Sequence, residues 1–475
     1  MEFSPKKSMF RARKKTIFSA IVFTISFSFS STAFSQEQSL DLSVPENQTQ
    51  RFMSTEGSVF SLEQALEYAL LHNPDLQIAQ QRIVQAEAQL GEALSSFYPQ
   101  VSARYSYQYT ENPALVFTHT INQRRLDFNS NFNHPGGIQN LRPEVLANYS
   151  LYRGGQDYQL SKAAKLGIET AVLEQSAIRN SLTQAVISSY YGYLATQEAY
   201  VVTENSIKAI ASELKQSQIR FEAGTLLKSD VLSLEVQLAE AEDAKIRAEN
   251  NIELVKTSLK TLLGLSNEQA FSIGRNSDSQ LPRNLPDFSQ VLKIALKQRP
   301  EIQAAEKQIA IQQRMLSAAK GEHLPRADAY VSYGQDSRDG SFSTSRDHIT
   351  AGVNVEMDIF AGFATTERIK KAQSKLIEAE ERKRRTQLNI EHEVKRAYLR
   401  LKEALARINI SKAAVVSAEE ARRMVKEQRQ AGVVTVTRYI ETEVARDNSH
   451  SRAIAAKFDA LRAEAELNKA QGLWR

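Results

Sequence analysis

The side chains that most often carry catalysis or bind metals are sparse in this 475-residue chain. It contains no cysteine, which excludes thiol catalysis, disulfides, thiolate metal sites and a lipid-modified N-terminal cysteine. Its seven histidines are scattered, and no two of them lie at metal-ligand spacing on one predicted helix. The sequence also lacks a nucleophile–base set and a phosphate-binding loop, so it predicts neither an enzyme nor a bound cofactor.

The chain does contain an internal tandem repeat. Asn73-Pro74 returns 226 residues later as Arg299-Pro300. Downstream the offset is 208 residues, and Ala223-Gly224 returns as Ala431-Gly432. One length change of 18 residues therefore separates the copies, and it falls between Tyr107 and Tyr152. A tandem duplication of this kind predicts two halves that do equivalent work.

The first 35 residues are expected to be a signal peptide. Six Lys and Arg residues precede an apolar run from Ile17 to about Phe29, and the small residues around Ala33 predict cleavage after Ser35. A retained N-terminal anchor is the alternative. The leader carries a net charge of +5, which is the net charge of the whole chain, so the mature chain is formally neutral. Because no basic stripe with interleaved aromatic residues is present, nucleic-acid binding is disfavoured.

Two segments of about ten residues alternate between apolar and polar side chains. They cover Val101 to Tyr109 in the first half and Ile349 to Ile359 in the second. Such segments are typical of strands in a membrane barrel, with a soluble half-buried sheet as the alternative. The signal peptide and the tyrosines near the strand ends favour the barrel. Weaker patterns, Val145 to Leu151 and Ala329 to Tyr333, predict a second strand in each half, and the loop from roughly Thr110 to Pro143 is expected on the outer face.

Glycines close each strand pair, and long helices follow them. Gly154, Gly155 and Gly362 suit a tight exit from strand into helix. From about Gln156 to Ala223 there is neither proline nor a cluster of helix breakers, and apolar residues recur every seven positions, which predicts a long coiled-coil helix. The second copy repeats this spacing at Val394, Leu401 and Ile408.

The hairpin turn in each half follows the long helix. Gly224 ends the first long helix, and the return helix is expected to start at Asp230 with Ser229 or Asp230 as its cap. The predicted organisation is therefore a signal peptide (1–35), an N-terminal lead-in (36–60), repeat 1 (61–265), a linker (266–286) and repeat 2 (287–473).

The predicted fold is mainly α-helical with a β-barrel part, and each repeat supplies two transmembrane strands and long coiled-coil helices. Four strands cannot close a barrel, and open strand edges are forbidden in lipid. Symmetric association must therefore complete it. Two copies would give eight strands and little or no pore, whereas three copies would give twelve strands and an aqueous lumen.

On these features the chain resembles the TolC family of outer-membrane efflux channels, over roughly Ser61 to Leu473. The residues that carry the resemblance are the helix openings, the prolines before strands, the strand-exit glycines and the hairpin turns: Asn73-Pro74, Arg299-Pro300, Pro99, Pro325, Gly154, Gly155, Gly362, Ala223-Gly224 and Ala431-Gly432. The resemblance implies a homotrimer with a 12-stranded barrel in the bacterial outer membrane and a periplasmic α-helical tunnel. It also implies docking to a periplasmic adaptor protein that is coupled to an inner-membrane pump.

The resemblance also nominates functional residues at the hairpin turns. It implies adaptor docking by Gly224, Thr225, Leu226, Gly432 and Val433, although helix termination alone would also explain the glycines.

The resemblance also implies that three residues lie at the tunnel entrance: Asp230, Arg438 and Glu441. Family members often carry two acidic residues on the second turn; here Arg438 departs from that pattern and Glu441 matches it. Three Glu441 side chains near a three-fold axis would attract cations, and Arg438 would weaken this preference. The alternatives are a solvated helical turn and, for Asp230, the helix cap, which we favour.

The leading interpretation is a passive outer-membrane exit duct that expels small toxic compounds. Type I protein secretion is the alternative within transport, and no residue separates the two. A periplasmic coiled-coil scaffold without a pore is an alternative of another class, and the alternating strands at the ends of the long helices disfavour it.

Overall fold

The computed structural model describes residues 59–129, 131, 133–274, 281 and 285–474. The predicted signal peptide, its cleavage site at Ser35, nearly all of the lead-in and part of the predicted linker lie outside the described residues. The chain divides into two compact units. In the smaller unit, strand β1 (Val59–Phe60) pairs in parallel with β4 (Ser272–Ile273).

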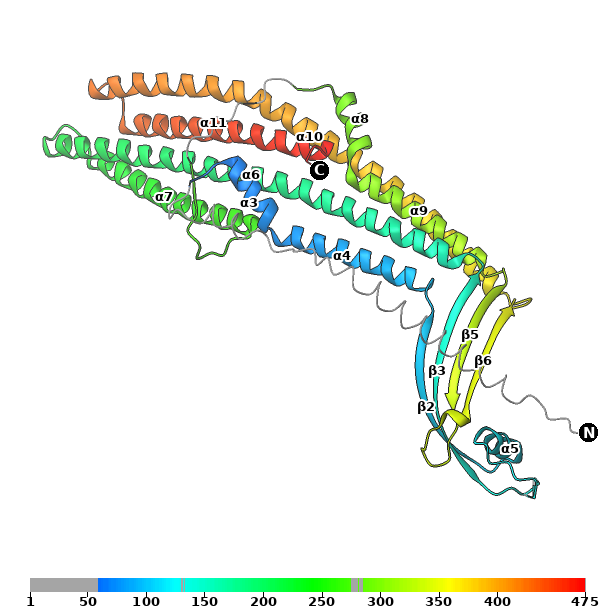
Figure 1. The fold of residues 1–475 in the computed structure, drawn as a ribbon. Helices are drawn as coiled ribbons and strands as arrows, with labels where there is room; N and C mark the ends of the chain where they lie inside the picture. Colours follow the sequence, from blue (N-terminus) through cyan, green and yellow to red (C-terminus); the bar gives the residue numbers. More distant parts are fainter. Residues whose placement is uncertain (1–58, 130, 132, 275–280, 282–284, 475) are drawn as a thin grey trace, which may run out of the picture. The chain divides into compact units, whose positions relative to one another are not determined.

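The larger unit contains the same order of elements twice (Figure 1). The first copy comprises α3 (Leu62–His72), α4 (Pro74–Ser95), β2 (Gln100–Thr110), β3 (Ile138–Arg153), α6 (Gln156–Glu222) and α7 (Lys228–Leu263). The second comprises α8 (Phe288–Gln298), α9 (Pro300–Gly321), β5 (Arg326–Gln335), β6 (Asp347–Glu356), α10 (Ala364–Gln430) and α11 (Val436–Gln471). Equivalent helices have equal lengths of 11, 22, 67 and 36 residues. The duplicated pattern in the sequence is thus a duplicated structure.

The copies differ between their strands. The first copy has the helix α5 (Pro113–Asn122) between β2 and β3, whereas the second has only a short 3-10 turn, η1 (Thr344–Arg346), between β5 and β6. The sequence predicted an insertion here but not that part of it is helical.

Side chains of the expected kind begin the short helices. Ser61 and Gln64 form the predicted capping box, in which the Ser61 Oγ accepts from the Gln64 amide at 3.3 Å and the Gln64 Oε1 accepts from the Ser61 amide at 2.9 Å. Asn73 caps α4, because its Oδ1 accepts from the amide of Asp75 at 2.8 Å. These bonds fix where each helix starts.

The four long strands form one antiparallel sheet in the order β2-β3-β5-β6. The hairpins of the two halves are therefore joined within one chain. We predicted a loop as far as Pro143, but β3 begins at Ile138 and pairs Pro143 with Tyr105. In a sequence, proline usually predicts the end of a strand, because it has no N–H for the ladder. Here its missing N–H is accommodated because the β3–β5 ladder stops at Glu144 and resumes only at an isolated bridge between Leu141 and Ser337.

The long helices pair as antiparallel hairpins, α6 with α7 and α10 with α11 (Figure 1). Helix α6 also contacts α11, α4 and α9, so it lies in the interior of the helical layer. α7 and α10 each contact mainly the helices of their own half. They therefore lie at the two edges of the helical layer.

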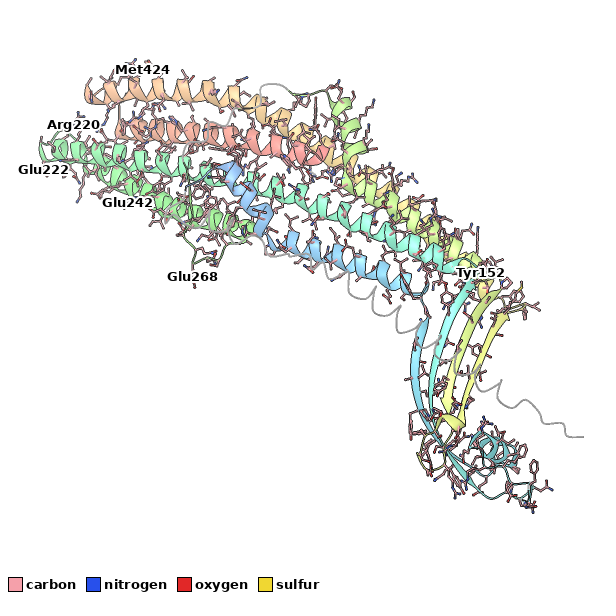
Figure 2. The ribbon with its side chains drawn as sticks, in the orientation of Figure 1. Tyr152, Arg220, Glu222, Glu242, Glu268 and Met424 are labelled. Atoms are coloured by element: carbon pink, nitrogen blue, oxygen red, sulfur yellow. The ribbon has the colours of Figure 1, made fainter. Side chains whose placement is uncertain are left out.

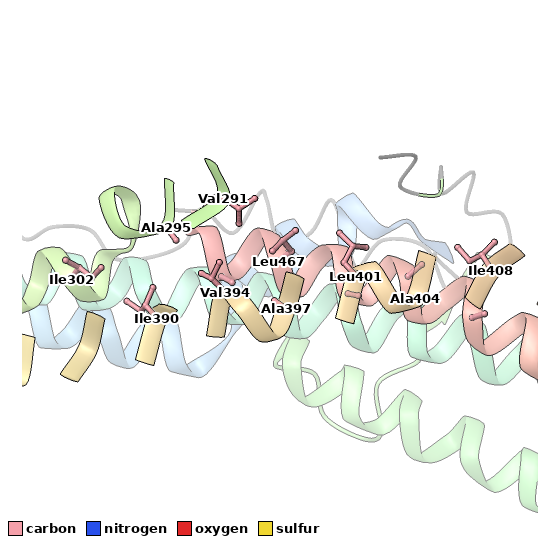
Figure 3. Close-up of a cluster of buried hydrophobic side chains, with 14 residues drawn as sticks. Val291, Ala295, Ile302, Ile390, Val394, Ala397, Leu401, Ala404, Ile408 and Leu467 are labelled. Atoms are coloured by element: carbon pink, nitrogen blue, oxygen red, sulfur yellow. The ribbon is translucent and has the colours of Figure 1, made fainter. Parts of the chain in front are cut away.

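The predicted heptads form the core of the second hairpin (Figure 3). The cluster draws on α8, α9, α10 and α11, and Val394, Leu401 and Ile408 are all buried in it, as predicted. The buried positions of α10 alternate in steps of four and three residues, the spacing of a coiled-coil seam: Ile390, Val394, Ala397, Leu401, Ala404 and Ile408. Within the described part of the chain, no helix is both long and apolar enough to cross a bilayer.

Candidate functional site: a two-faced sheet and two hairpin turns

The four-stranded sheet has one apolar face and one polar face. Up to the register shift between Ser150 and Tyr152 near the end of β3, its pairing places the odd-numbered residues of all four strands on one side, including Val101, Tyr105, Val145, Val331 and Val353. The even-numbered residues occupy the other side, including Arg104, Glu144, Asp328, Ser332 and Asn354. A sheet with this division can stand between lipid on one side and water on the other.

Both edges of this sheet are open in the protomer. β2 and β6 each have a partner on one side only among the described residues. The apolar side chains near these edges are exposed, with Val101 at 62% and Val353 at 63%. Unpaired backbone groups cost several kcal/mol each in lipid, so the sheet needs further strands at both edges before it can span a membrane.

Residues in the left-handed backbone region connect strands to the long helices. Gly154 has φ +61°, and a Cβ there would lie 2.0 Å from the Gly321 carbonyl oxygen, so only glycine fits. Gly155 (φ +74°) and Gly362 (φ +60°) have open space around them, so their need for glycine is conformational. In the second copy Phe363 takes the place of Gly155 with φ +66°, an uncommon conformation for a bulky side chain.

The two hairpin turns share one geometry. Gly224 (φ +77°) follows α6, its amide bonds to the Phe221 carbonyl, and the Thr225 amide bonds to the Arg220 carbonyl at 2.9 Å. Figure 2 shows Arg220 and Glu222 at the free end of the α6/α7 hairpin. The turn also buries part of Leu226 against Ile210 and Leu234.

The second turn repeats these bonds. Gly432 (φ +74°) follows α10, and the Val433 amide bonds to the Gln428 carbonyl at 2.9 Å. The Val433 side chain is 75% exposed, and Figure 2 shows Met424 near the same end of α10. Both turns therefore present a glycine and exposed side chains at the ends of the hairpins.

The predicted cap of α7 is wrong. The helix begins at Lys228, Leu227 occupies the cap position without a side-chain bond, and Asp230 lies in the first turn. An acid there still interacts favourably with the helix dipole, which explains the sequence signal. In the second copy Thr435 caps α11, and Arg438 and Glu441 lie on its first turns with their side chains 3.1 Å apart.

One buried ion pair joins the two hairpins near their ends, and further buried charges lie within the α10/α11 hairpin; sequence analysis missed both. Arg429 on α10 lies 3.0 Å from the Glu213 carboxylate on α6. Glu443 on α11 lies 2.7 Å from Arg422 on α10 and 3.3 Å from Arg446. Burial, with the nearby Glu443 carboxylate, raises the pKa of the Tyr439 phenol well above its usual value. Charged residues at buried heptad positions were the available signal, but the sequence could not say which helices would face each other.

Among the described residues, no group of three or more His, Cys, Asp or Glu side chains is placed to hold a metal ion.

Comparison with known proteins agrees with this architecture. The model of the family described as "Outer membrane efflux protein" matches residues 65–265 and 291–473. Protein CyaE of Bordetella pertussis is 23% identical over 350 residues, which cover 73% of this chain and 70% of the relative. The toluene efflux pump outer membrane protein TtgC of Pseudomonas putida is 24% identical over 332 residues, or 67% of this chain and 61% of the relative.

A solved structure shows the same fold. The Campylobacter jejuni CmeC outer membrane channel superposes with a TM-score of 0.74 at 18% sequence identity, covering 86% of this chain and 85% of that one. The family model spans most of the chain in two segments, one in each copy of the repeated structure. The chain therefore belongs to the outer membrane efflux protein family, as a TolC-like exit channel of the bacterial outer membrane with a periplasmic helical part, and it is not an enzyme.

Proposed function

We propose that this chain forms a homotrimeric exit duct that expels small toxic compounds through the outer membrane, coupled by a periplasmic adaptor to an inner-membrane pump. The observation that carries the trimer is the two-faced sheet with open edges at β2 and β6. Three copies joined edge to edge would supply twelve strands, enough for a barrel with an aqueous lumen. The polar face would then line the lumen.

Apolar stripes on the two edge helices support the same head-to-tail contact. On α10 the exposed residues Ile377, Leu388, Leu399 and Ile410 recur every eleven residues, which is three helical turns. On α7, four exposed residues also fall on one helical face: Leu232, Val236, Ile246 and Leu254. A seam between α7 of one protomer and α10 of the next would bury both stripes, and repeating that contact closes a ring.

The proposed coupling to a pump is argued from the hairpin turns, and the proposed cargo is argued from the relatives. The chain carries no phosphate-binding loop, so transport needs an external energy source. We assign adaptor docking to Gly224, Thr225, Leu226, Gly432 and Val433, which lie at the exposed hairpin ends. The name of the TtgC relative indicates toluene efflux for that protein, and we extend small toxic solutes to this chain as its cargo.

The trimer and the pore are tested with the purified full-length protein. In detergent it should have the mass of three protomers, and in planar bilayers it should form ion channels. Leu399→Glu should weaken the trimer because it places a charge in the α7–α10 seam, whereas Val201→Glu, at an exposed apolar position of the interior helix α6, should not. A monomer that forms no channels would overturn the proposal.

The cargo is tested in a deletion strain. The strain should become sensitive to toxic solutes and recover when the gene is restored. Normal tolerance combined with loss of a secreted protein would instead favour type I protein secretion.

A further inference from the structure

Helix α5 lies against the polar face of the sheet. His119 on α5 contacts Gln108 on β2, with its Nε2 3.2 Å from the Gln108 Oε1. Gln123, directly after α5, donates from its Nε2 to the Asn140 Oδ1 at 2.9 Å. Gln108 and Asn140 are register partners on the same face as Arg104. α5 is therefore held on the side of the sheet that would face the lumen.

The contacts that hold α5 are buried, although they lie at the outer end of the sheet. Gln123 is 1% exposed and Asn140 is 2% exposed. Asn140 also donates to Asp336, which follows β5 and is itself buried. Arg124 reaches the other hairpin loop, where its Nε donates to the Ser345 carbonyl at 3.3 Å. Buried polar groups that are bonded in this way favour one position of the helix over alternatives.

The opposite side of α5 carries exposed apolar side chains. Val116, His119 and Gln123 form the buried side of the helix. Phe117 and Ile121 lie on the side that faces away from these residues and remain exposed in the protomer. Asn112 and Pro113 start the helix, and the Asn112 Oδ1 accepts from the Ala114 amide at 3.0 Å. α5 thus has its own start signal and two distinct faces.

We propose that α5 is a constriction inside the outer mouth of the channel, which limits the size of the solutes that pass. The proposal rests on the proposed function, because only a closed barrel has a lumen. Three copies would carry three such helices, each with Ile121 on the side that faces the passage. An apolar narrowing disfavours hydrated ions and bulky hydrophilic solutes. The second hairpin carries no equivalent helix, so the insertion gives the first hairpin a role of its own.

The first test loosens the helix. In the double variant His119→Ala/Gln123→Ala, α5 loses the three bonds that these side chains make to Gln108, Gln139 and Asn140 of the sheet. Single-channel conductance should rise by at least about 1.5-fold, and larger polyethylene glycols should enter from the outer side. The control is Gln77→Ala, which removes a 3.0 Å bond to the Leu71 carbonyl in the helical part and should leave both measurements unchanged.

The second test uses the absence of native cysteine. In Ile121→Cys, a charged methanethiosulfonate reagent added in the aqueous phase should reduce the channel current. In Val353→Cys the new thiol would face lipid from the apolar side of the sheet, so the current should not change.

These outcomes separate the inference from the proposed function. If the wild-type protein forms no channels, the proposed function fails first. If channels form, but the double variant has wild-type conductance or the Ile121→Cys current is unaffected, the constriction is disproved. Should the double variant fail to assemble, the cysteine experiment decides alone.

Discussion

Glu213 on α6 and Arg429 on α10 form an ion pair between the two hairpins of one protomer, with the Arg429 Nε 3.0 Å from the Glu213 Oε1. Their side chains are only 11% and 6% exposed. Arg220 also crosses between the hairpins and donates to the Arg429 carbonyl at 3.2 Å and to the Gln430 carbonyl at 3.4 Å. The hairpin ends are therefore joined by buried charge, and separating them would require breaking these bonds.

Removing one partner of this pair should loosen the hairpin ends. Arg429→Gln leaves the Glu213 carboxylate buried without its cation, which typically costs about 3–5 kcal/mol. Amide hydrogen exchange near the end of α6 should accelerate, and Glu213→Gln/Arg429→Gln should be less affected than the single variant. The control is Arg423→Gln, whose partners Glu420 and Glu427 are exposed. Equal exchange in the single variant and the wild type would show that the pair does not join the hairpins.

Asn73 and Arg299 make equivalent contacts in the two copies. The Asn73 Nδ2 donates to the Leu262 carbonyl at 2.8 Å, and the Arg299 Nη1 donates to the Ala470 carbonyl at 3.3 Å. Asn73→Ala removes this bond and the cap of α4, so it should lower the free energy of unfolding by about 2 kcal/mol. Denaturant titration followed by circular dichroism measures the change. A loss no larger than that of Gln77→Ala would contradict this role.

In the second copy, the stability that the Arg299 contact with Glu393 provides should depend on pH. Glu393 lies 3.0 Å from Arg299 and 2.9 Å from Lys469. Burial alone would raise the pKa of its carboxyl, but the two cations outweigh burial and hold that pKa below the usual 4.5. A lowered carboxyl pKa stabilises the fold above the usual value, and the stabilisation is lost as pH falls through the lowered pKa.

Melting temperatures of the wild type and of Glu393→Gln test this dependence. The variant should melt lower than the wild type at pH 7, and the difference should shrink below pH 4.5. The control is Glu420→Gln. This change breaks an ion pair on the exposed surface of the helix, where such pairs contribute little to stability. A difference that stays constant from pH 7 to pH 3 would exclude the ion pair as its source.

Much of the fold followed from local sequence signals. The capping box at Ser61, the glycines at positive φ and the heptads at Val394 and Leu401 each act over a few residues, so they can be identified without tertiary information. Equal spacing in the two halves then predicted a repeated structure.

The features that sequence analysis missed depend on tertiary context. Pro143 occupies a strand because the neighbouring ladder is interrupted beside it. A heptad shows which side of a helix is buried but not which helix covers it, so the sequence could not pair Glu213 with Arg429. The position of α5 likewise depends on Gln108 and Asn140, which only strand pairing brings together.

Gly432 and Gly155 provide a matched pair for testing adaptor docking. Each has φ +74° with no atom near the position of a Cβ, so valine strains the backbone equally at both. Gly432 lies in the exposed turn after α10, whereas Gly155 lies between β3 and α6. Gly432→Val should reduce cross-linking to the adaptor while trimer assembly persists, and Gly155→Val should leave the cross-linking yield per trimer unchanged. Equal cross-linking in both variants would count against docking at this turn.

Arg438 and Glu441 give the clearest test of the tunnel entrance. They lie three residues apart on α11 with a 3.1 Å ion pair, and both side chains are more than half exposed, so each change should cost little stability. Three Glu441 carboxylates near the axis would attract cations, and Arg438 would offset them. Glu441→Gln should therefore lower the cation preference measured as a reversal potential in a salt gradient, and Arg438→Gln should raise it. Glu427→Gln, which alters another exposed pair near the end of α10, is the control. If Glu441→Gln and Arg438→Gln shift the potential in the same direction, or neither shifts it, these side chains do not line the ion path.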